Sequence, residues 1–305
     1  MNNSTFLLYL VNKSVFFETK THKKLYTIQI RFYIMNRIEL LTMKKIGLIG
    51  LILMCLIPFV GYNQSNSKTN EDHPRLFQVK NNGKFGYIDK TGTFVINPQF
   101  DDARSFSEGL APVEIGDKWG FIDKKGIFVI NPQFDSVNGF SEELAEVQIG
   151  GKWGFIDKKG NFVINPQFDN AFGFSEGLAP VEIEDKWGII DNKGTFVINP
   201  QFDDAFDFSE GLAAVEIEHK WGFIDKKGSF VINPQFDFAF DFSEGLAAVE
   251  IGDKWGVIDN KGTFVINPQF DFASGLLEGL SKVEIGNRDG VIDKTGKMIY
   301  IEDNN

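Results

Sequence analysis

Carboxylate and amide side chains recur at fixed spacing along this chain, and they are the first groups to consider for chemistry. Asp157, Asn165 and Asp169 carry the oxygen atoms that Ca²⁺ prefers as ligands. Each also has a structural explanation: Asp157 begins a turn, Asn165 precedes a proline and Asp169 opens a connecting segment. Their spacing matches no known calcium loop, so the sequence favours the structural explanation and predicts no metal site.

Tryptophans form a second recurring set. Each stands 34 residues after the one before it and is followed by glycine. Repeated aromatic rings can act as platforms for sugars or choline-like cations. We favour the competing explanation, that each indole packs between successive units and is not exposed to a ligand. The structural repeat core predicted in this way is Phe85, Trp119, Trp153, Trp187, Trp221 and Trp255.

The residues required for covalent or acid–base catalysis do not come together in this sequence. His219 is the only histidine in the repeated region, and it occupies a tight-turn position held elsewhere by Asp, Gly or Asn. The single cysteine, Cys55, lies in an apolar run, which excludes a disulfide framework and a Cys-based metal site. Neither a nucleophile–base pair nor a phosphate-binding glycine loop is present. We therefore expect a non-enzymatic protein without catalytic residues, cofactor or metal.

The charge balance narrows the range of partners. The 305 residues carry a formal net charge of −11. Binding to phosphate groups needs clustered Lys and Arg, so this balance disfavours nucleic acid and anionic lipid. An unknown protein or polysaccharide remains as the partner.

A repeat of 34 residues positions all these groups. Alignment on the tryptophans gives seven units from residue 76 to residue 302. The period equals that of tetratricopeptide repeats, but those units are pairs of helices. Here each full unit contains Asn-Pro, several glycines and runs such as Phe-Val-Ile, which favour strands.

The unit around Trp187 predicts three short strands, over residues 178–183, 186–191 and 195–199. Glu184-Asp185 suits a two-residue hairpin, and Gly194 suits a turn with a left-handed glycine. We expect Pro200 to end the third strand, because proline cannot donate a ladder hydrogen bond. In the crossover that follows, we expect the Ser209 hydroxyl to cap a backbone amide.

Apolar runs on both faces of the strands indicate that the units stack on one another. Phe196, Val197 and Ile198 could not all be covered by a lone hairpin. The sequence thus predicts an all-β tandem array of seven three-stranded units, an open β-solenoid-like superhelix. No unit is split between the ends of the array, which disfavours the alternative, a closed β-propeller-like ring. Asp289 stands where other units have Trp, and it predicts an exposed C-terminal face.

The repeated residues resemble the WG-repeat (KWG-repeat) family of bacterial proteins. The matching motif is Lys-Trp-Gly-Phe-Ile-Asp, Lys-Gly, Val-Ile-Asn-Pro-Gln-Phe-Asp and Phe-Ser-Glu-Gly-Leu-Ala, as over residues 152–179. Five well-kept copies and two degenerate ones cover about three quarters of the chain. The resemblance implies a β-rich bacterial repeat protein. It implies no common enzymatic activity and no functional residue.

The N-terminal part predicts export. Residues 43–62 contain two lysines, an apolar stretch and small residues, which is the pattern of a signal peptide. Residues 1–42 are then an upstream extension from a misplaced start; the alternative is a short cytoplasmic segment before a membrane anchor at residues 46–62. Residues 63–75 form a polar linker.

These observations favour a secreted or envelope-associated protein-binding scaffold, in which near-identical units add their weak contacts. Carbohydrate or cell-wall binding through the repeated aromatic residues is the alternative. We expect positions that differ between units to be exposed and to determine which partner binds. Examples are Ser136 and Asn138 in one unit and Asn170 and Phe172 in the next.

Overall fold

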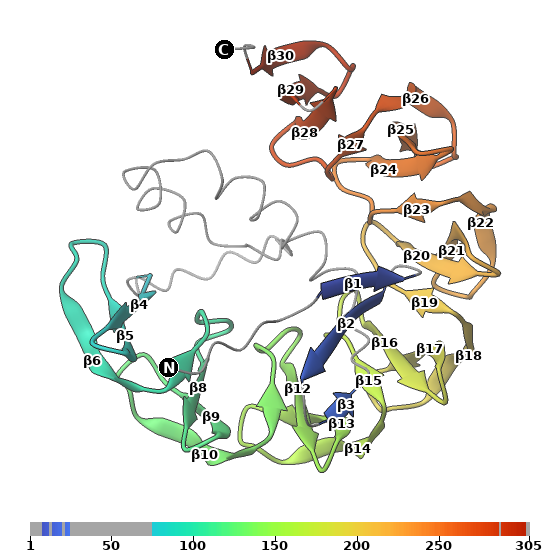
Figure 1. Cartoon of the computed structure of the whole chain (residues 1–305). Coiled ribbons are helices and arrows are strands. Elements are labelled where there is room, and N and C mark those ends of the chain that lie inside the picture. The colour runs from blue at the N-terminus through green and yellow to red at the C-terminus, as the bar shows by residue number, and fades with distance from the viewer. Residues whose placement is uncertain (1–7, 12–13, 20–21, 25–74, 287, 303–305) are drawn as a thin grey trace. The chain divides into compact units, whose positions relative to one another are not determined.

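A computed structural model describes residues 8–11, 14–19, 22–24, 75–286 and 288–302. They belong to two compact units, residues 1–66 and 67–305. All regular structure in the described residues is β-strand, as predicted (Figure 1). None of these residues forms a helix long and apolar enough to cross a membrane. The predicted signal segment 43–62, with Cys55, and the linker up to residue 74 lie outside the described ranges.

The first unit contains one antiparallel sheet that the sequence analysis did not predict. Its strands are β1 (Leu8–Val11), β2 (Ser14–Thr19) and β3 (His22–Lys24). They pair in chain order as two successive hairpins.

The second unit is a tandem array of seven antiparallel sheets that follow one another in chain order (Figure 1). The first has three strands, β4 (Phe77–Asn81), β5 (Lys84–Ile88) and β6 (Phe94–Phe100). Each of the other six has four. The first sheet and the last, β27 to β30 (residues 272–301), lie at the two separate ends of an arc (Figure 1). The array is therefore open, as predicted, and the closed ring is not formed.

The expectation of three strands per unit is wrong for six of the seven sheets. The crossover supplies a further strand of two residues, as where Asp204 pairs with Glu216 and Ala205 with Val215. Two residues are too short to show the alternation by which a strand is recognised in sequence. These short strands are β7 (Asp102–Ala103), β11 (Ser136–Val137), β15 (Asn170–Ala171), β19 (Asp204–Ala205), β23 (Phe238–Ala239) and β27 (Phe272–Ala273).

The two central strands of each sheet form the predicted hairpin. Glu184 and Asp185 connect them with φ of 52° and 60°, as a two-residue type I′ turn requires. The first strands are β8 (Ala111–Ile115), β12 (Leu144–Ile149), β16 (Leu178–Ile183), β20 (Leu212–Ile217), β24 (Leu246–Ile251) and β28 (Leu280–Ile285). Their partners are β9 (Lys118–Ile122), β13 (Lys152–Asp157), β17 (Lys186–Asp191), β21 (Lys220–Asp225), β25 (Lys254–Asp259) and β29 (Arg288–Asp293).

In the six sheets whose last strand contains a proline, that strand does not end at the proline, contrary to the prediction. Ile189 pairs with Ile198 and Trp187 with Phe202, so a bulge of three residues lies opposite Gly188. Pro200 lies within that bulge, where its missing N–H breaks no ladder bond. These strands are β6, β10 (Phe128–Phe134), β14 (Phe162–Phe168), β18 (Phe196–Phe202), β22 (Phe230–Phe236) and β26 (Phe264–Phe270). The last strand of the seventh sheet, β30 (Met298–Ile301), contains no proline.

The bulge explains why glycine follows each tryptophan. A Cβ atom on Gly222 would lie 2.6 Å from the Ile232 carbonyl oxygen and 2.7 Å from the Pro234 nitrogen. Real Cβ atoms do not approach backbone atoms so closely. The hairpin strand must therefore lack a side chain where the neighbouring strand bends toward it.

The core of the array lies between successive sheets, not within one. Each sheet has a forward face, toward the next sheet in the chain, and a backward face, toward the preceding sheet. The forward face of the β15–β18 sheet packs against the backward face of the β19–β22 sheet. The first sheet contributes Leu178, Trp187, Ile189, Ile198 and Phe202, and the second contributes Ala205, Phe208, Ala213, Val215 and Ile224. Equivalent residues form the other inter-sheet cores.

Replacing the glycine beneath the bulge should destabilise the array. We expect Gly222→Ala to cost about 1–3 kcal/mol, the usual range for forcing extra atoms into a packed site. Gly275→Ala is the matched control, because a Cβ there meets nothing within 4 Å and its φ is not positive. Denaturant unfolding followed by tryptophan fluorescence measures both. Equal midpoints for the two variants would contradict this account of the Trp-Gly pair.

Candidate interaction surface

In six of the seven sheets the last strand presents the same three side chains to solvent. In β18 these are Val197, Asn199 and Gln201, at alternate positions on one face. The six valines at this position are each 44–47% exposed. We call these side chains the Val-Asn-Gln band: Val95, Asn97, Gln99, Val129, Asn131, Gln133, Val163, Asn165, Gln167, Val197, Asn199, Gln201, Val231, Asn233, Gln235, Val265, Asn267 and Gln269.

Buried neighbours and a local hydrogen bond hold the side chains of the band in place. Ile198 and Phe202, which alternate with it, are buried in the inter-sheet core. The Gln201 side-chain amide donates to the Asn199 carbonyl 3.3 Å away, and the same bond recurs in other sheets. Six nearly superposable sets of one apolar and two amide side chains are thus displayed in advance of any partner.

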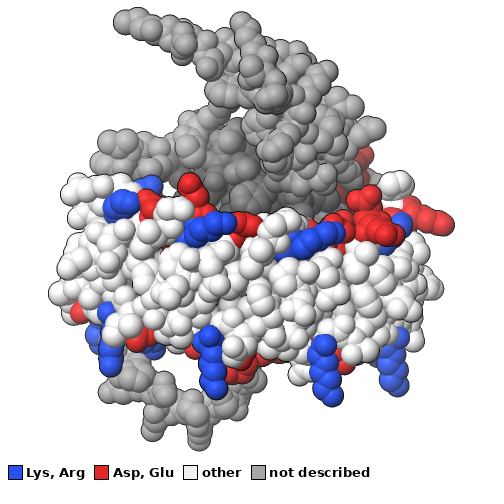
Figure 2. Space-filling view, turned by 90° about the horizontal axis from the view of Figure 1, so that it is seen from below, with Lys and Arg blue, Asp and Glu red and all other residues white. Residues whose placement is uncertain are grey.

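Charged residues flank the band but do not enter it. Figure 2 shows an uncharged surface between two rows of Lys, Arg, Asp and Glu. The strand motif Phe-Val-Ile-Asn-Pro-Gln-Phe contains no ionisable side chain. This surface can therefore offer hydrogen bonds and apolar contact, but no charge pairing except at its margins.

One margin consists of neutralised ion pairs at the hairpin turns. Lys186 bonds to Asp203 at 2.5 Å, and the other oxygen of Asp203 accepts from the Glu218 amide at 2.8 Å. The Lys186 hydrogen bond lowers the pKa of the Asp203 carboxyl. Exposed pairs of this kind contribute little to stability but hold the turns in place. The six pairs are Lys84–Asp101, Lys118–Asp135, Lys152–Asp169, Lys186–Asp203, Lys220–Asp237 and Lys254–Asp271.

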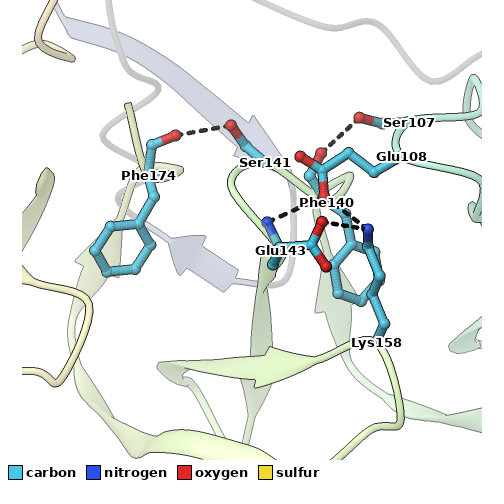
Figure 3. A network of polar contacts seen from close by, with 7 residues as sticks. All are labelled: Ser107, Glu108, Phe140, Ser141, Glu143, Lys158 and Phe174. Atoms are coloured by element: carbon cyan, nitrogen blue, oxygen red, sulfur yellow. Dashed lines mark hydrogen bonds and ion pairs between the residues drawn. The ribbon is translucent and has the colours of Figure 1, made fainter. Parts of the chain in front are cut away.

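The opposite margin contains a contact between sheets that sequence reasoning missed. The prediction for Ser209 was that its hydroxyl caps a nearby amide, and Ser141 holds the equivalent position. The Ser141 hydroxyl instead donates to the Phe174 carbonyl of the next sheet at 2.7 Å (Figure 3). Ser209 donates likewise to Phe242 at 2.8 Å. The expectation failed because the acceptor lies 33 residues away, outside the range of local capping rules.

Glutamate beside each of these serines extends the contact. The Glu108 carboxylate accepts from the Glu143 amide at 3.0 Å and pairs with Lys158 at 3.2 Å, and Lys158 also reaches Glu143 (Figure 3). Lys226–Glu176 and Lys294–Glu244 repeat the pair. Adjacent sheets are therefore tied by polar contacts at the margin as well as by their apolar core.

The predicted repeat-core residues lie between the sheets. Trp119, Trp187, Trp221 and Trp255 are only 1–6% exposed. Trp153 and Phe85 are partly buried and pack against inter-sheet cores. The indole faces that a sugar platform would need are thus covered.

Aromatic contacts link the C-terminal tryptophans into a column. Phe206 stacks on Trp221 with 4.8 Å between ring centroids, and Phe238 of the next sheet lies 5.1 Å from the same indole. Phe240 and Trp255 continue the column at 5.2 Å. In the N-terminal half, Arg104 takes the stacking place over its tryptophan, Trp119, at 4.9 Å.

The positions predicted to be exposed and to tune a partner are instead partly buried. Ser136, Asn138, Asn170 and Phe172 all lie on or beside the short strands. Asn138 accepts from Arg104 of the preceding sheet, and Phe172 stacks on Trp187 at 5.0 Å. These positions therefore contribute to packing within and between sheets.

Two carboxyl groups, the buried Glu146 and the half-buried Asp204, have raised pKa values. Glu146 is 3% exposed, and its burial raises its pKa to about 7, with Asp207 adding to the rise. Burial likewise raises the pKa of Asp204 to about 7, and Glu216 and Glu182 add to it. Both groups pack between sheets, where an uncharged carboxylic acid is easier to bury than a carboxylate.

The oxygen ligands considered for Ca²⁺ are engaged elsewhere. Asp157 accepts from the Lys159 and Asn161 amides at 2.9 Å, and Asp169 binds Lys152. Asn165 belongs to the Val-Asn-Gln band. Within the described ranges, no group of three or more His, Cys, Asp or Glu side chains is placed to hold a metal ion. His219 is exposed in a hairpin turn, 4.0 Å from Glu216.

Comparison with known families finds one match. The family described as WG containing repeat matches six tandem stretches, residues 85–119, 119–153, 153–187, 187–221, 221–255 and 255–288. Comparison with curated proteins finds no match.

Comparison with solved structures finds likeness at low sequence identity. A eukaryotic initiation factor is 13% identical, with 76% of this chain and 74% of that chain covered and a TM-score of 0.53. KlHsv2 with a replaced loop has a TM-score of 0.45 at 11% identity, covering 71% and 88% of the two chains. PorZ, a bacterial surface component of the type-IX secretion system of Porphyromonas gingivalis, has a TM-score of 0.36 at 13% identity, covering 70% and 37%. The first shows likeness in fold alone.

Burial of the indoles predicts the fluorescence of the chain. All five tryptophans belong to the array, so emission should be blue-shifted from that of free tryptophan and weakly quenched by iodide. Trp153 is the least buried, and Trp153→Phe should remove most of the quenchable fraction. Strong iodide quenching that survives this substitution would show that other indoles are exposed.

The buried carboxyl of Glu146 predicts a pH dependence. Its folded pKa of about 7 exceeds its ordinary value of 4.5, so the folded state binds more protons in this window and its stability falls as pH rises through it. Glu146→Gln removes this loss. The variant should gain up to about 3 kcal/mol relative to the native chain between pH 4.5 and 7.5.

Urea unfolding of both chains at each pH measures this difference. Glu218→Gln, at an exposed hairpin turn, controls for the loss of one negative charge. A constant difference between Glu146→Gln and the native chain across the window would contradict the assignment.

Proposed function

We propose that this chain, which belongs to the WG containing repeat family, is an exported, non-enzymatic scaffold that binds protein partners through the Val-Asn-Gln band. The observation that carries the proposal is the exposure of the same valine at 44–47% in six successive sheets. A valine side chain that is nearly half exposed contributes less to the core than the buried isoleucine beside it. Its recurrence in these six sheets is therefore better explained by contact with a partner.

The chemistry of the band favours an extended, uncharged stretch of polypeptide. Valine offers apolar contact, and the exposed Asn and Gln side chains beside it offer hydrogen-bond donors and acceptors. The bulge and proline in each last strand disfavour simple strand addition to this edge. Recognition would then run through side chains, with successive sheets contacting successive segments of the partner.

Repetition supplies the affinity that one site lacks. A single Val-Asn-Gln set is too small to bind tightly. Six sets on one rigid array turn each later contact into an intramolecular event, which multiplies weak affinities. A partner that spans several sheets would therefore be strongly preferred over one that contacts a single sheet.

Two sequence features complete the proposal. The signal-like segment at residues 43–62 supports export from the cytoplasm. The absence of a nucleophile–base pair from the repeated sequence supports a binding role over an enzymatic one. The buried indoles weigh against the carbohydrate alternative as it was based on aromatic platforms.

Graded disruption of the band tests the proposal. A photo-crosslinking residue replaces Val129, Val197 or Val231 in the full chain. Each variant is exposed to the envelope proteins of the organism that produces the chain. One protein should be crosslinked from all three positions. With that protein purified, Val→Lys substitution in one, three and six last strands should weaken binding stepwise. With six changes the loss should reach about 100-fold or more.

The control places three new lysines at the adjoining turns, as Thr195→Lys, Ser229→Lys and Thr263→Lys, where the native side chains are also exposed. These should change binding far less than three lysines within the band. Unchanged binding with all six valines replaced would rule out the band as the binding surface.

A further inference from the structure

The two ends of the array expose complementary halves of one more inter-sheet interface. In the cores that join the first five sheets, each forward face is covered by the backward face of the next sheet. Within the described residues of the array, no sheet follows the last one or precedes the first. What each end presents can therefore be compared, position by position, with the interfaces that the chain already forms.

The forward face of the last sheet is apolar and exposed. Leu280 is 43% exposed and Tyr300 58%, whereas the isoleucines equivalent to Tyr300 in the inner sheets are 3–5% exposed. Val291 of the same face is partly buried, unlike the fully buried Ile189 at the equivalent position. A terminal repeat that ended the array for good would be expected to carry a polar outer face.

The backward face of the first sheet is also uncovered. Phe77, Val79 and Ile88 are partly exposed. Their equivalents in the inner sheets, such as Val181 and Ile190, are fully buried. The first sheet also lacks the short fourth strand, so β4 remains an edge strand.

The glycine in the turn before each last strand also shows that the backward face of the first sheet is uncovered. In the next six sheets a Cβ on this glycine would meet an isoleucine of the preceding sheet, as for Gly228 and Ile198 at 3.1 Å. A Cβ on Gly92 of the first sheet meets nothing within 4 Å. Gly92 and Tyr300 hold the two positions that form this contact inside the array.

The Glu–Lys pairs between successive sheets indicate how the two ends would align with each other. Glu108, Glu176 and Glu244 each pair with a lysine of the next sheet. Glu278 of the last sheet has no next sheet, and Lys90 of the first sheet occupies the equivalent lysine position. Continuing the array from one chain into another would bring this pair together.

One substitution in the last sheet makes its forward face more apolar. Inner sheets have serine where the last has Leu277, and that serine donates to a carbonyl in the crossover of the next sheet. Leu277, 65% exposed, replaces this hydroxyl with an apolar side chain on the uncovered forward face.

From these observations we infer that the chain assembles head to tail, the first sheet of one copy stacking on the last sheet of another. The contact is heterologous, because the two surfaces differ. Asp289, which replaces tryptophan on the forward face and pairs with Lys282 at 3.2 Å, weakens the junction relative to those within the chain. Assembly is therefore reversible and dependent on concentration.

Sedimentation velocity of the full chain over a range of concentrations tests the inference. The native chain should shift from monomer to dimer and longer species. Tyr300→Asp and Phe77→Asp should each raise the dissociation constant by about tenfold or more, since each places a charge in an apolar contact. Asp289→Trp, which restores the inner-sheet residue, should lower it. Ile127→Asp, in an inner sheet, outside the Val-Asn-Gln band and 60% exposed, should leave it unchanged.

Mixing the two end variants is the decisive measurement. Tyr300→Asp retains a native first sheet and Phe77→Asp retains a native last sheet, so an equimolar mixture should form dimers that neither forms alone. If either variant alone still associates as the native chain does, the contact is not between these ends and the inference fails. A native chain that stays monomeric at all concentrations would also overturn it, and would leave the proposal for the Val-Asn-Gln band untouched.

Discussion

The whole structure depends on one constraint: a sheet of three or four short strands cannot cover its own two apolar faces. The forward face of one sheet, with Leu178 and Ile198, requires the small residues of the next, such as Ala205 and Ala213. These alanines lie among larger residues such as Phe208 and Ile224, and they let adjacent sheets approach closely. The hairpins, the bulge and the margin contacts all serve to present these two faces at the correct separation.

Sequence indicated most of this architecture because its signals are local. Positive φ at Glu184 and Asp185 follows from a two-residue hairpin, and the turn at Gly194 follows from its glycine. The requirement that units stack follows from runs apolar on both faces. These features depend on residue types a few positions apart, which is the range over which sequence can be interpreted directly.

What sequence misjudged depends on partners one repeat away or on very short elements. Pro200 ends a strand by the usual rule, yet here the bulge opposite Gly188 accommodates it. Differences between copies at Asn138 and Phe172 suggested a variable surface, but both side chains are partly buried, against Arg104 and Trp187. The exposure of Val197 was also misjudged, since it stands in an apolar run that predicts burial on both faces.

Identical interfaces also have a genetic consequence. Every inner sheet presents the same forward and backward faces, so removing or adding one 34-residue copy joins surfaces that already fit. The nearly identical stretches of coding sequence that specify them are natural substrates for unequal recombination. Array length can thus change between generations in whole-sheet steps without loss of foldability, and each step alters the reach and avidity of the protein together.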